Sequence, residues 1–300
     1  MTLQQDAFDE PTSKLALGTV QFGQRYGVAN AAGRVTPQTV AAILDLAGSE
    51  GIDTLDTAAA YGNSESCLGD VGVSSWRVIT KLPALPDDTS DVASWVELQV
   101  RGSMRRLRIA RLEGLLLHRP ADLLGPHGAR LLTALALLKS RDWIGAAGIS
   151  IYDPGELDML WPLWQPEILQ APCSVLDRRL VQSGWLPRLK RQGTRLHLRS
   201  VFLQGLLLMP SRQRPAFFAR WRGLLDRWLD WCAAHSVSPL RAALGYACAL
   251  PDAERVVVGV DSIAQLQEIL DAARAPAPTP PADLFSDERE LLEPSRWMVA

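Results

Sequence analysis

The sequence predicts an α/β protein of the (β/α)8 barrel class, in which eight parallel strands form a TIM barrel surrounded by helices. Short apolar runs alternate with longer amphipathic ones, which is typical of repeated strand–helix units. About eight such units fit into 300 residues, and a barrel of this kind uses about 250. The first strand leads into LGTVQFGQRYG, which lacks the GxGxxG fingerprint of a doubly wound nucleotide-binding sheet.

The first half of the chain contains four predicted strands. The first long helix begins with Thr36 as N-cap and Pro37 at the first helical position, and Gly51 ends it. The run Leu112–His118 is apolar almost throughout, as in a strand with both faces buried. We expect strands at 15–19, 54–56, 77–81 and 112–118, and helices at 37–50, from about 64, and at 94–107.

The same alternation continues through the second half. Strands are predicted at 146–150, 168–170, 195–201 and 255–258, and helices at 128–141, 154–160, 184–192, about 217–249 and 262–273. Right-handed helical crossovers would join these parallel strands. The segment APAPTPP at 275–281 has the composition of an extended linker. We therefore expect one barrel domain over 1–275 and a Pro-rich linker and tail over 276–300, with a short helix at 287–292.

The composition argues against several classes of protein. The net charge is −2, so no basic excess favours nucleic-acid binding. The polar start, MTLQQDAFDEPTSK, does not resemble a signal peptide, and no run approaches the roughly 18 apolar residues of a membrane span. The four scattered cysteines show neither a CxxC pair nor metal-ligand spacing. We expect a soluble, cytoplasmic protein with reduced thiols; its oligomeric state stays open.

Four chemically active residues lie at or just after the ends of consecutive predicted strands. Asp56 ends the second strand and Tyr61 follows it, Lys81 ends the third, and His118 ends the fourth. Active-site residues of a (β/α)8 barrel lie at this end of the strands, so we expect the four to meet. A metal-dependent hydrolase would need an HxH or comparable ligand cluster, and none is present, so we expect no metal.

The four residue types fit the reduction of a carbonyl group. Such a reaction needs a proton on oxygen as hydride reaches carbon. A tyrosine, with an ordinary pKa of about 10, is a poor acid at neutral pH, and a nearby ammonium such as that of Lys81 would make it a better one. Asp56 could keep a buried Lys81 charged, and His118 could donate a hydrogen bond to the substrate oxygen.

Residues from about 14 to 273 resemble the aldo-keto reductase family. GIDTLDTAAAYGNSESCLG is similar to the segment around its catalytic aspartate and tyrosine, ITKL to its lysine strand and LEGLLLHRP to its histidine strand. The resemblance implies a catalytic set of Asp56, Tyr61, Lys81 and His118, with Tyr61 as the proton donor.

Further segments resemble the parts of this family that hold a nicotinamide dinucleotide. WIGAAGISIY and EILQAPCSVLDRR imply contacts of Ser150 and Gln170 with the carboxamide, and RSVFLQGLL resembles the loop over the pyrophosphate. VVVGVDSIAQLQEIL resembles the adenosine-phosphate segment, whose predicted helix begins at an anion-favouring N-terminus. The implied cofactor residues are Gly18, Thr19, Gln21, Ser150, Gln170, Ser200, Phe202, Gly205, Gly259, Ser262, Gln265 and Glu268.

Four positions depart from the family pattern. Ile151 stands where the family has an asparagine, and Val201 follows Ser200 in place of a proline. No basic residue stands where a 2′-phosphate would be neutralised; Asp261 is there instead, and Ile269 replaces an asparagine. The resemblance implies NADPH as cofactor, and these changes leave NADH open.

The sequence therefore predicts an NAD(P)H-dependent enzyme that reduces an aldehyde, a ketone or a sugar-like carbonyl compound. Phe22, Tyr26 and the loop 24–33 could wall the substrate site. The alternative is a cofactor-binding regulatory or scaffold protein that retains the reductase fold. The four intact catalytic residues favour the enzyme, while the same catalyst would serve either direction of the reaction.

Overall fold

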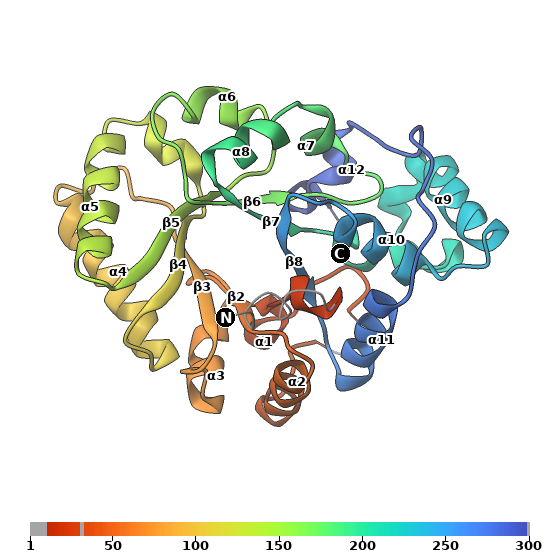
Figure 1. The fold of residues 1–300 in the computed structure, drawn as a ribbon, viewed down its shortest axis with the longest axis horizontal. Coiled ribbons are helices and arrows are strands. Elements are labelled where there is room, and N and C mark those ends of the chain that lie inside the picture. The colour runs from red at the N-terminus through yellow and green to blue at the C-terminus, as the bar shows by residue number, and fades with distance from the viewer. Residues whose placement is uncertain (1–10, 31–32, 299–300) are drawn as a thin grey trace, which may run out of the picture.

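Eight strands close into a barrel in the computed structural model, which describes residues 11–30 and 33–298. Each strand is parallel to its two neighbours, and β8 pairs with β1 to complete the ring (Figure 1). The predicted fold class is thus confirmed. The first ten residues, on which most of the signal-peptide argument rests, lie outside the described part. The strands are β1 (Leu15–Gly18), β2 (Thr54–Asp56), β3 (Arg77–Leu82), β4 (Leu112–Leu117), β5 (Ile144–Ser150), β6 (Ile168–Pro172), β7 (Arg195–Arg199) and β8 (Ala253–Gly259).

Helices connect the strands and surround the barrel (Figure 1). The helices are α1 (Val20–Gly23), α2 (Pro37–Ser49), α3 (Ser64–Val71), α4 (Val92–Leu107), α5 (Gly128–Ser140), α6 (Glu156–Leu160), α7 (Arg179–Gln182), α8 (Leu186–Gln192), α9 (Arg222–Ala234), α10 (Pro239–Cys248), α11 (Ile263–Arg274) and α12 (Arg289–Leu292). Short 3-10 turns are η2 (Pro11–Lys14), η3 (Pro120–Leu124), η4 (Leu203–Leu208), η5 (Ser211–Gln213), η6 (Ala216–Trp221) and η7 (Pro294–Arg296). The longest of the described α-helices, α4, has 16 residues. No described helix is long and apolar enough to cross a bilayer.

Local capping explains where several helices begin. Thr36, Asp91 and Ser262 each accept a hydrogen bond from the backbone N–H three residues later, which satisfies a free donor of the first turn. The predicted helical stretch 217–249 is divided because Ser238 caps a new helix and Pro239 fits only its first turn. Sequence periodicity locates such helices but not their exact breaks.

The inside and outside of the barrel alternate along each strand. Leu196 and Leu198 of β7 belong to the core between strands and helices, so His197 and Arg199 face inward. Four inward side chains from neighbouring strands form a separate apolar cluster in the middle of the barrel: Ile79, Leu116, Ala146 and Ile168. These side chains fill the interior of the barrel below its carboxyl-terminal rim.

Ion pairs close the opposite, amino-terminal end. Glu113 Oε1 lies 2.9 Å from Arg77 Nη2 and 2.7 Å from Arg195 Nη1. The guanidinium of Arg255, a residue only 5% exposed, donates to Asp53 Oδ1 at 3.3 Å. These charges neutralise one another at the amino-terminal end. A site is therefore expected at the carboxyl-terminal rim, the opposite end of the barrel.

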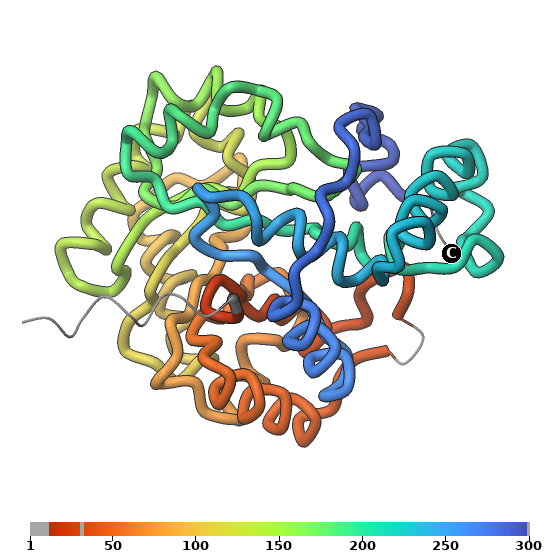
Figure 2. Tube along the Cα trace, turned by 45° about the vertical axis from the view of Figure 1, so that its right-hand side comes forward, coloured from red at the N-terminus to blue at the C-terminus, as the bar shows by residue number. Residues whose placement is uncertain are grey.

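A second hydrophobic core lies beside the barrel. Phe218 and Trp228, from the long β7–β8 connection, pack there with Leu291 and Leu292 of the C-terminal segment. In Figures 1 and 2 this last segment leaves α11 and runs past α10 to the space between α7 and α9. Two hydrogen bonds connect this segment to the rim. The backbone N–H of Ser286 donates to Leu176 O at 2.9 Å, and Arg179 Nη1 donates to Glu293 Oε1 at 3.5 Å.

Candidate active site

The four predicted catalytic residues lie together at the carboxyl-terminal rim. The ammonium of Lys81 donates to both carboxylate oxygens of Asp56, at 2.8 and 2.7 Å, and to Thr57 O at 2.9 Å. Its Nζ lies 5.0 Å from the ring centroid of Tyr61. The ring of His118 meets that of Tyr61 edge to face, at 5.9 Å between centroids and 83° between planes. The strand ends of β2, β3 and β4 thus bring a carboxylate, an ammonium, a phenol and an imidazole into one cluster.

The charges of this cluster depend on burial and on each other. Burial would lower the pKa of Lys81, but Asp56, and then Tyr61, more than offset this and raise it above its ordinary value. Lys81 therefore stays protonated. Burial, followed by the positive charges of Lys81 and Arg199, lowers the pKa of His118 to about 4. His118 is therefore neutral at pH 7 and can donate one ring N–H.

Gln170 and Ser150 hold the cluster from the side of β5 and β6. Gln170 Nε2 donates to Asp56 Oδ1 at 2.6 Å, and Ser150 Oγ donates to Gln170 Oε1 at 3.2 Å. Gln170 is fully buried, and the chain of hydrogen bonds orients the Asp56 carboxylate that binds Lys81. Thr19 supports the same strand end, because its Oγ1 donates to Asp56 O at 3.0 Å.

A cavity of about 550 Å³ opens above these residues, within the range of small-molecule sites. Asp56, Tyr61 and His118 line it, whereas Lys81 lies beneath its wall. Of the twelve predicted cofactor residues, Gln170 and Ser262 do not line the cavity. The other ten do: Gly18, Thr19, Gln21, Ser150, Ser200, Phe202, Gly205, Gly259, Gln265 and Glu268.

Glycines of two neighbouring strands line part of the cavity. Gly18 and Gly259 are register partners on β1 and β8, and a Cβ added at Gly18 would lie 3.1 Å from Val257 Cγ1. Gly18 is also the register partner of Asp56 on β2, so these backbone positions lead from the Asp56 cluster to the strand end before α11. Gln21 lines the same stretch, and its buried Oε1 has no partner among the described residues. The cradle and the spare acceptor suit a nucleotide whose reactive end lies beside Tyr61.

The loop after β7 approaches the cavity in an unusual backbone conformation. Ser200, Leu203 and Gln204 have φ values of 60°, 44° and 54°, and Gly205 has 90°. Such left-handed residues cost free energy and persist where the surroundings require them. The conformation folds the chain tightly over the cavity, and Trp228 Nε1 anchors it by donating to Leu207 O at 2.8 Å.

The far end of the cavity is polar and acidic. Ser262 caps α11 through its Oγ, which accepts from Gln265 N. Gln265 in turn accepts from Asp261 N at 2.7 Å through Oε1. Asn30, from the loop after β1, donates to Asp261 Oδ1 at 3.2 Å. Burial raises the pKa of Asp261, and no basic side chain of β8 or α11 lines this end.

Among the residues that line the cavity, sequence reasoning gave no role to Tyr152 or Arg199. Arg199 is the charged last residue of β7, but the predicted strand ran on to Val201 and so did not place Arg199 at the rim. Tyr152 lies in the loop after β5, which no pattern marks. Of the predicted wall residues, Tyr26 and other members of the loop 24–33, among them Asn30, line the cavity, while Phe22 is buried in the core.

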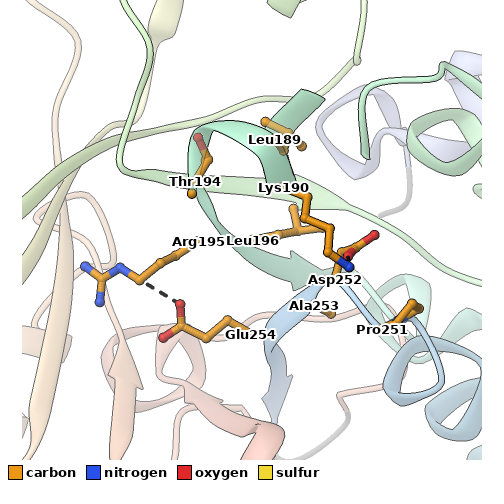
Figure 3. A pocket seen from close by; sticks show the side chains of 10 residues that line it. Leu189, Lys190, Thr194, Arg195, Leu196, Pro251, Asp252, Ala253 and Glu254 are labelled. Atoms are coloured by element: carbon orange, nitrogen blue, oxygen red, sulfur yellow. Dashed lines mark ion pairs between the residues drawn. The ribbon is translucent and has the colours of Figure 1, made fainter. Parts of the chain in front are cut away.

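A smaller hollow of about 340 Å³ lies at the amino-terminal end, between α8 and the starts of β7 and β8. Figure 3 shows its side chains. Lys190 pairs with Asp252 at 3.0 Å and Arg195 with Glu254 at 3.9 Å. The charged side chains of this hollow therefore neutralise one another. Within residues 11–30 and 33–298, no three His, Cys, Asp or Glu side chains are placed to hold a metal ion.

Comparisons with known proteins agree with this architecture. The model of the aldo/keto reductase family matches residues 14–280. An aldo-keto reductase from Bacillus halodurans is 21% identical in its holo form, over 89% of this chain and 88% of that one, with a TM-score of 0.70. Its apo form is 20% identical over 95% of each chain, with a TM-score of 0.67.

A protein from Pseudomonas aeruginosa, proposed to be an aldo-keto reductase, is 21% identical over 87% of this chain and 89% of its own, with a TM-score of 0.65. At such identities these structures support the fold, and no curated protein sequence matches the chain. The family model spans nearly the whole barrel. The chain therefore belongs to the aldo/keto reductase family.

Proposed function

We propose that the protein is a nicotinamide-dependent reductase that converts an aldehyde or ketone to an alcohol, with Tyr61 as the proton donor. The observation that carries this proposal is the buried ammonium of Lys81, which lies between Asp56 and the ring of Tyr61. An ion pair under a phenol at a cavity wall is costly to bury and has little structural use there. It has a clear use if the phenol gives up its proton.

The protein's own residues would manage the proton and the negative charge. A bound reduced nicotinamide would supply the hydride that reaches the carbonyl carbon. The hydroxyl of Tyr61 gives its proton to the carbonyl oxygen, and Lys81 stabilises the tyrosinate that remains. His118, neutral because its pKa is lowered to about 4, donates an N–H to the same oxygen and orients it.

The residues that would hold the cofactor follow the floor of the cavity. Ser150 and Gln21 lie near the reactive end, the loop 200–205 beside the middle, and Gln265 and Glu268 at the end near α11. A 2′-phosphate at that end would face Asp261 and Glu268 with no basic residue of β8 or α11 lining it. We therefore propose that NADH binds more tightly than NADPH, because like charges repel.

The test follows cofactor absorbance with a reactive aromatic aldehyde, such as 4-nitrobenzaldehyde, for the wild type and Tyr61→Phe. We expect Tyr61→Phe to lose about 100-fold or more in kcat, the contribution of a general acid, while the Kd of the cofactor is unchanged. Tyr246→Phe is the matched control, since Tyr246 stacks on Arg178 outside the cavity. The ratio of kcat/KM for NADH and NADPH tests the cofactor proposal.

Full activity of Tyr61→Phe would remove Tyr61 from the role of proton donor. A folded wild type that binds neither cofactor would refute the reductase function. Tight cofactor binding without turnover of any aldehyde or ketone would instead favour the regulatory alternative.

A further inference from the structure

The cavity contains a positive charge that no carboxylate of the described residues neutralises. Arg199 is the last residue of β7 and lines the cavity. Its Nη2 donates to Ile151 O at 2.9 Å and its Nη1 donates to Ser200 Oγ at 3.1 Å. Both acceptors are neutral, and Arg199 forms no ion pair with any described residue. By contrast, Arg179, next to the same rim, pairs with the carboxylate of Asp177 at 2.8 Å.

The other charges of the cavity do not compensate Arg199. Lys81 and Asp56 neutralise each other through two hydrogen bonds. His118 is neutral at pH 7, since its pKa is about 4. Asp261 and Glu268 lie at the α11 end. The reactive end therefore carries about one net positive charge from Arg199, partly shielded from water, which favours an anionic ligand.

The guanidinium of Arg199 points toward the reactive end of the cavity and away from β8. It lies 4.5 Å from the ring centroid of Tyr152 and contacts the carbonyl of Ile151, both of which follow β5. Its charge lowers the pKa of His118 and opposes the rise in the pKa of Tyr26, which desolvation and then Tyr61 cause. Arg199 thus lies near His118 and Tyr26, at the end of the cavity where the carbonyl would react under the proposed function.

We propose that Arg199 binds an anionic group of the substrate, a carboxylate or a phosphate, so that the enzyme acts on acidic carbonyl compounds. This inference rests on the proposed reductase function. A guanidinium matches the two oxygens of a carboxylate or phosphate, and that of Arg199 rests against the ring of Tyr152. The rings of Tyr26 and Tyr152, which also line the cavity, would cover the carbon skeleton between the anion and the carbonyl.

The test compares aldehydes that differ only in charge. With 4-formylbenzoate and its methyl ester, we expect wild-type kcat/KM to favour the acid by about tenfold or more, the usual effect of a charge-assisted hydrogen bond. Arg199→Met should lose most of this preference, because its kcat/KM for the acid should fall far more than its kcat/KM for the ester. Glyceraldehyde and its 3-phosphate, compared in the same way, show whether the anion is a phosphate.

Arg188→Met is the matched control. The guanidinium of Arg188 also stacks on an aromatic ring, that of Trp185 at 4.8 Å, but Arg188 does not line the cavity. Its loss should leave the preference for acids intact.

Two results would overturn the inference. One is a wild type that prefers the neutral partner of both pairs. The other is an Arg199→Met variant that binds cofactor more weakly and slows both members of each pair equally, since the anion held by Arg199 would then be the cofactor pyrophosphate.

Binding of the product alcohols separates failure of this inference from failure of the proposed function. Tryptophan fluorescence can compare 4-(hydroxymethyl)benzoate with its methyl ester. Tighter binding of the acid to wild type, lost in Arg199→Met, would support the anion site even if neither aldehyde turned over. Equal binding of acid and ester would overturn it.

Discussion

Lys81 shows how a single residue links burial to chemistry. It is 1% exposed, and each of its three ammonium hydrogens has an acceptor on Asp56 or Thr57. A lysine in such a place would lose its proton without a partner, and Asp56 supplies one. The position of Asp56 depends in turn on Gln170. The charge state of this cluster is therefore set by residues of three strands, β2, β3 and β6.

His197 is a second buried titratable residue, below the site, and its effect should be on stability. It is 1% exposed, neither ring nitrogen has a partner among the described residues, and desolvation followed by nearby arginines lowers its pKa to about 3. The unfolded chain takes up a proton near pH 6.5 and the folded protein does not. Stability is therefore lost as the pH falls from about 6.5 toward 3.

We expect His197→Leu to remove this contribution. Between pH 6.5 and 5, its free energy of unfolding should fall by about 2 kcal/mol less than that of the wild type, as measured by urea denaturation at both pH values. His235→Leu, at the exposed end of α9, is the control. An unchanged acid dependence in His197→Leu would contradict the prediction.

At the scale of elements, the loop after β7 determines how the chain covers the cavity. Gly205 has φ +90°, and an added Cβ would lie 2.6 Å from Ala29 Cβ of the loop after β1. The two loops therefore meet closely over the cavity, and Trp228 fixes one of them through Leu207 O. Cofactor binding should depend on this contact.

Gly205→Ala should lower stability by about 1–3 kcal/mol, the cost of a strained backbone, and raise the Kd of the cofactor. Thermal unfolding and a cofactor titration measure the two effects. Gly193→Ala separates strain from contact, since Gly193 has φ +73° and no atom within 4 Å of an added Cβ. This control should lose stability and bind cofactor normally. Equal cofactor affinity in both variants would show that the loop contact has no role in binding.

At the scale of the whole molecule, the C-terminal segment completes the second core. Leu291 and Leu292 are at most 1% exposed, and they pack with Phe218 and Trp228. Glu293 binds Arg289 and Arg296 within the segment and Arg179 of the rim. We propose that residues 1–275 form one barrel domain and that the tail, 276–300, folds onto it cooperatively.

Leu291→Ala should therefore destabilise the whole protein, by about 2–5 kcal/mol for a buried leucine, within a single unfolding transition. Calorimetry or urea denaturation measures both properties. Leu98→Ala is the control, since Leu98 is 60% exposed on α4, and it should change stability by less than about 0.5 kcal/mol. A separate early transition in Leu291→Ala would mean that the tail folds independently of the barrel.

The sequence by itself determined the barrel and the meeting of Asp56, Tyr61, Lys81 and His118 at its rim. Both depend on local pattern: alternating apolar runs specify strand–helix units, and a strand-end residue such as Asp56 or Lys81 must lie at the carboxyl-terminal rim once the barrel closes. Ends of elements shifted by one or more residues, as at β7, where the charged Arg199 is the last strand residue. Capping and backbone φ set these limits locally, and periodicity does not resolve them.

Only the tertiary structure decided what surrounds the cluster. Gln170 donates a hydrogen bond to Asp56, which lies 114 positions away along the chain, because the barrel brings the two residues together. Gln170 lies behind Asp56 and does not line the cavity. The contact of Asn30 with Asp261 spans 231 positions, and the C-terminal tail covers a core formed by the β7–β8 connection. Such contacts are long-range and follow from how loops meet in space. Arg199, an ordinary strand residue in the sequence, becomes an unpaired charge in the cavity because no described carboxylate is brought to it.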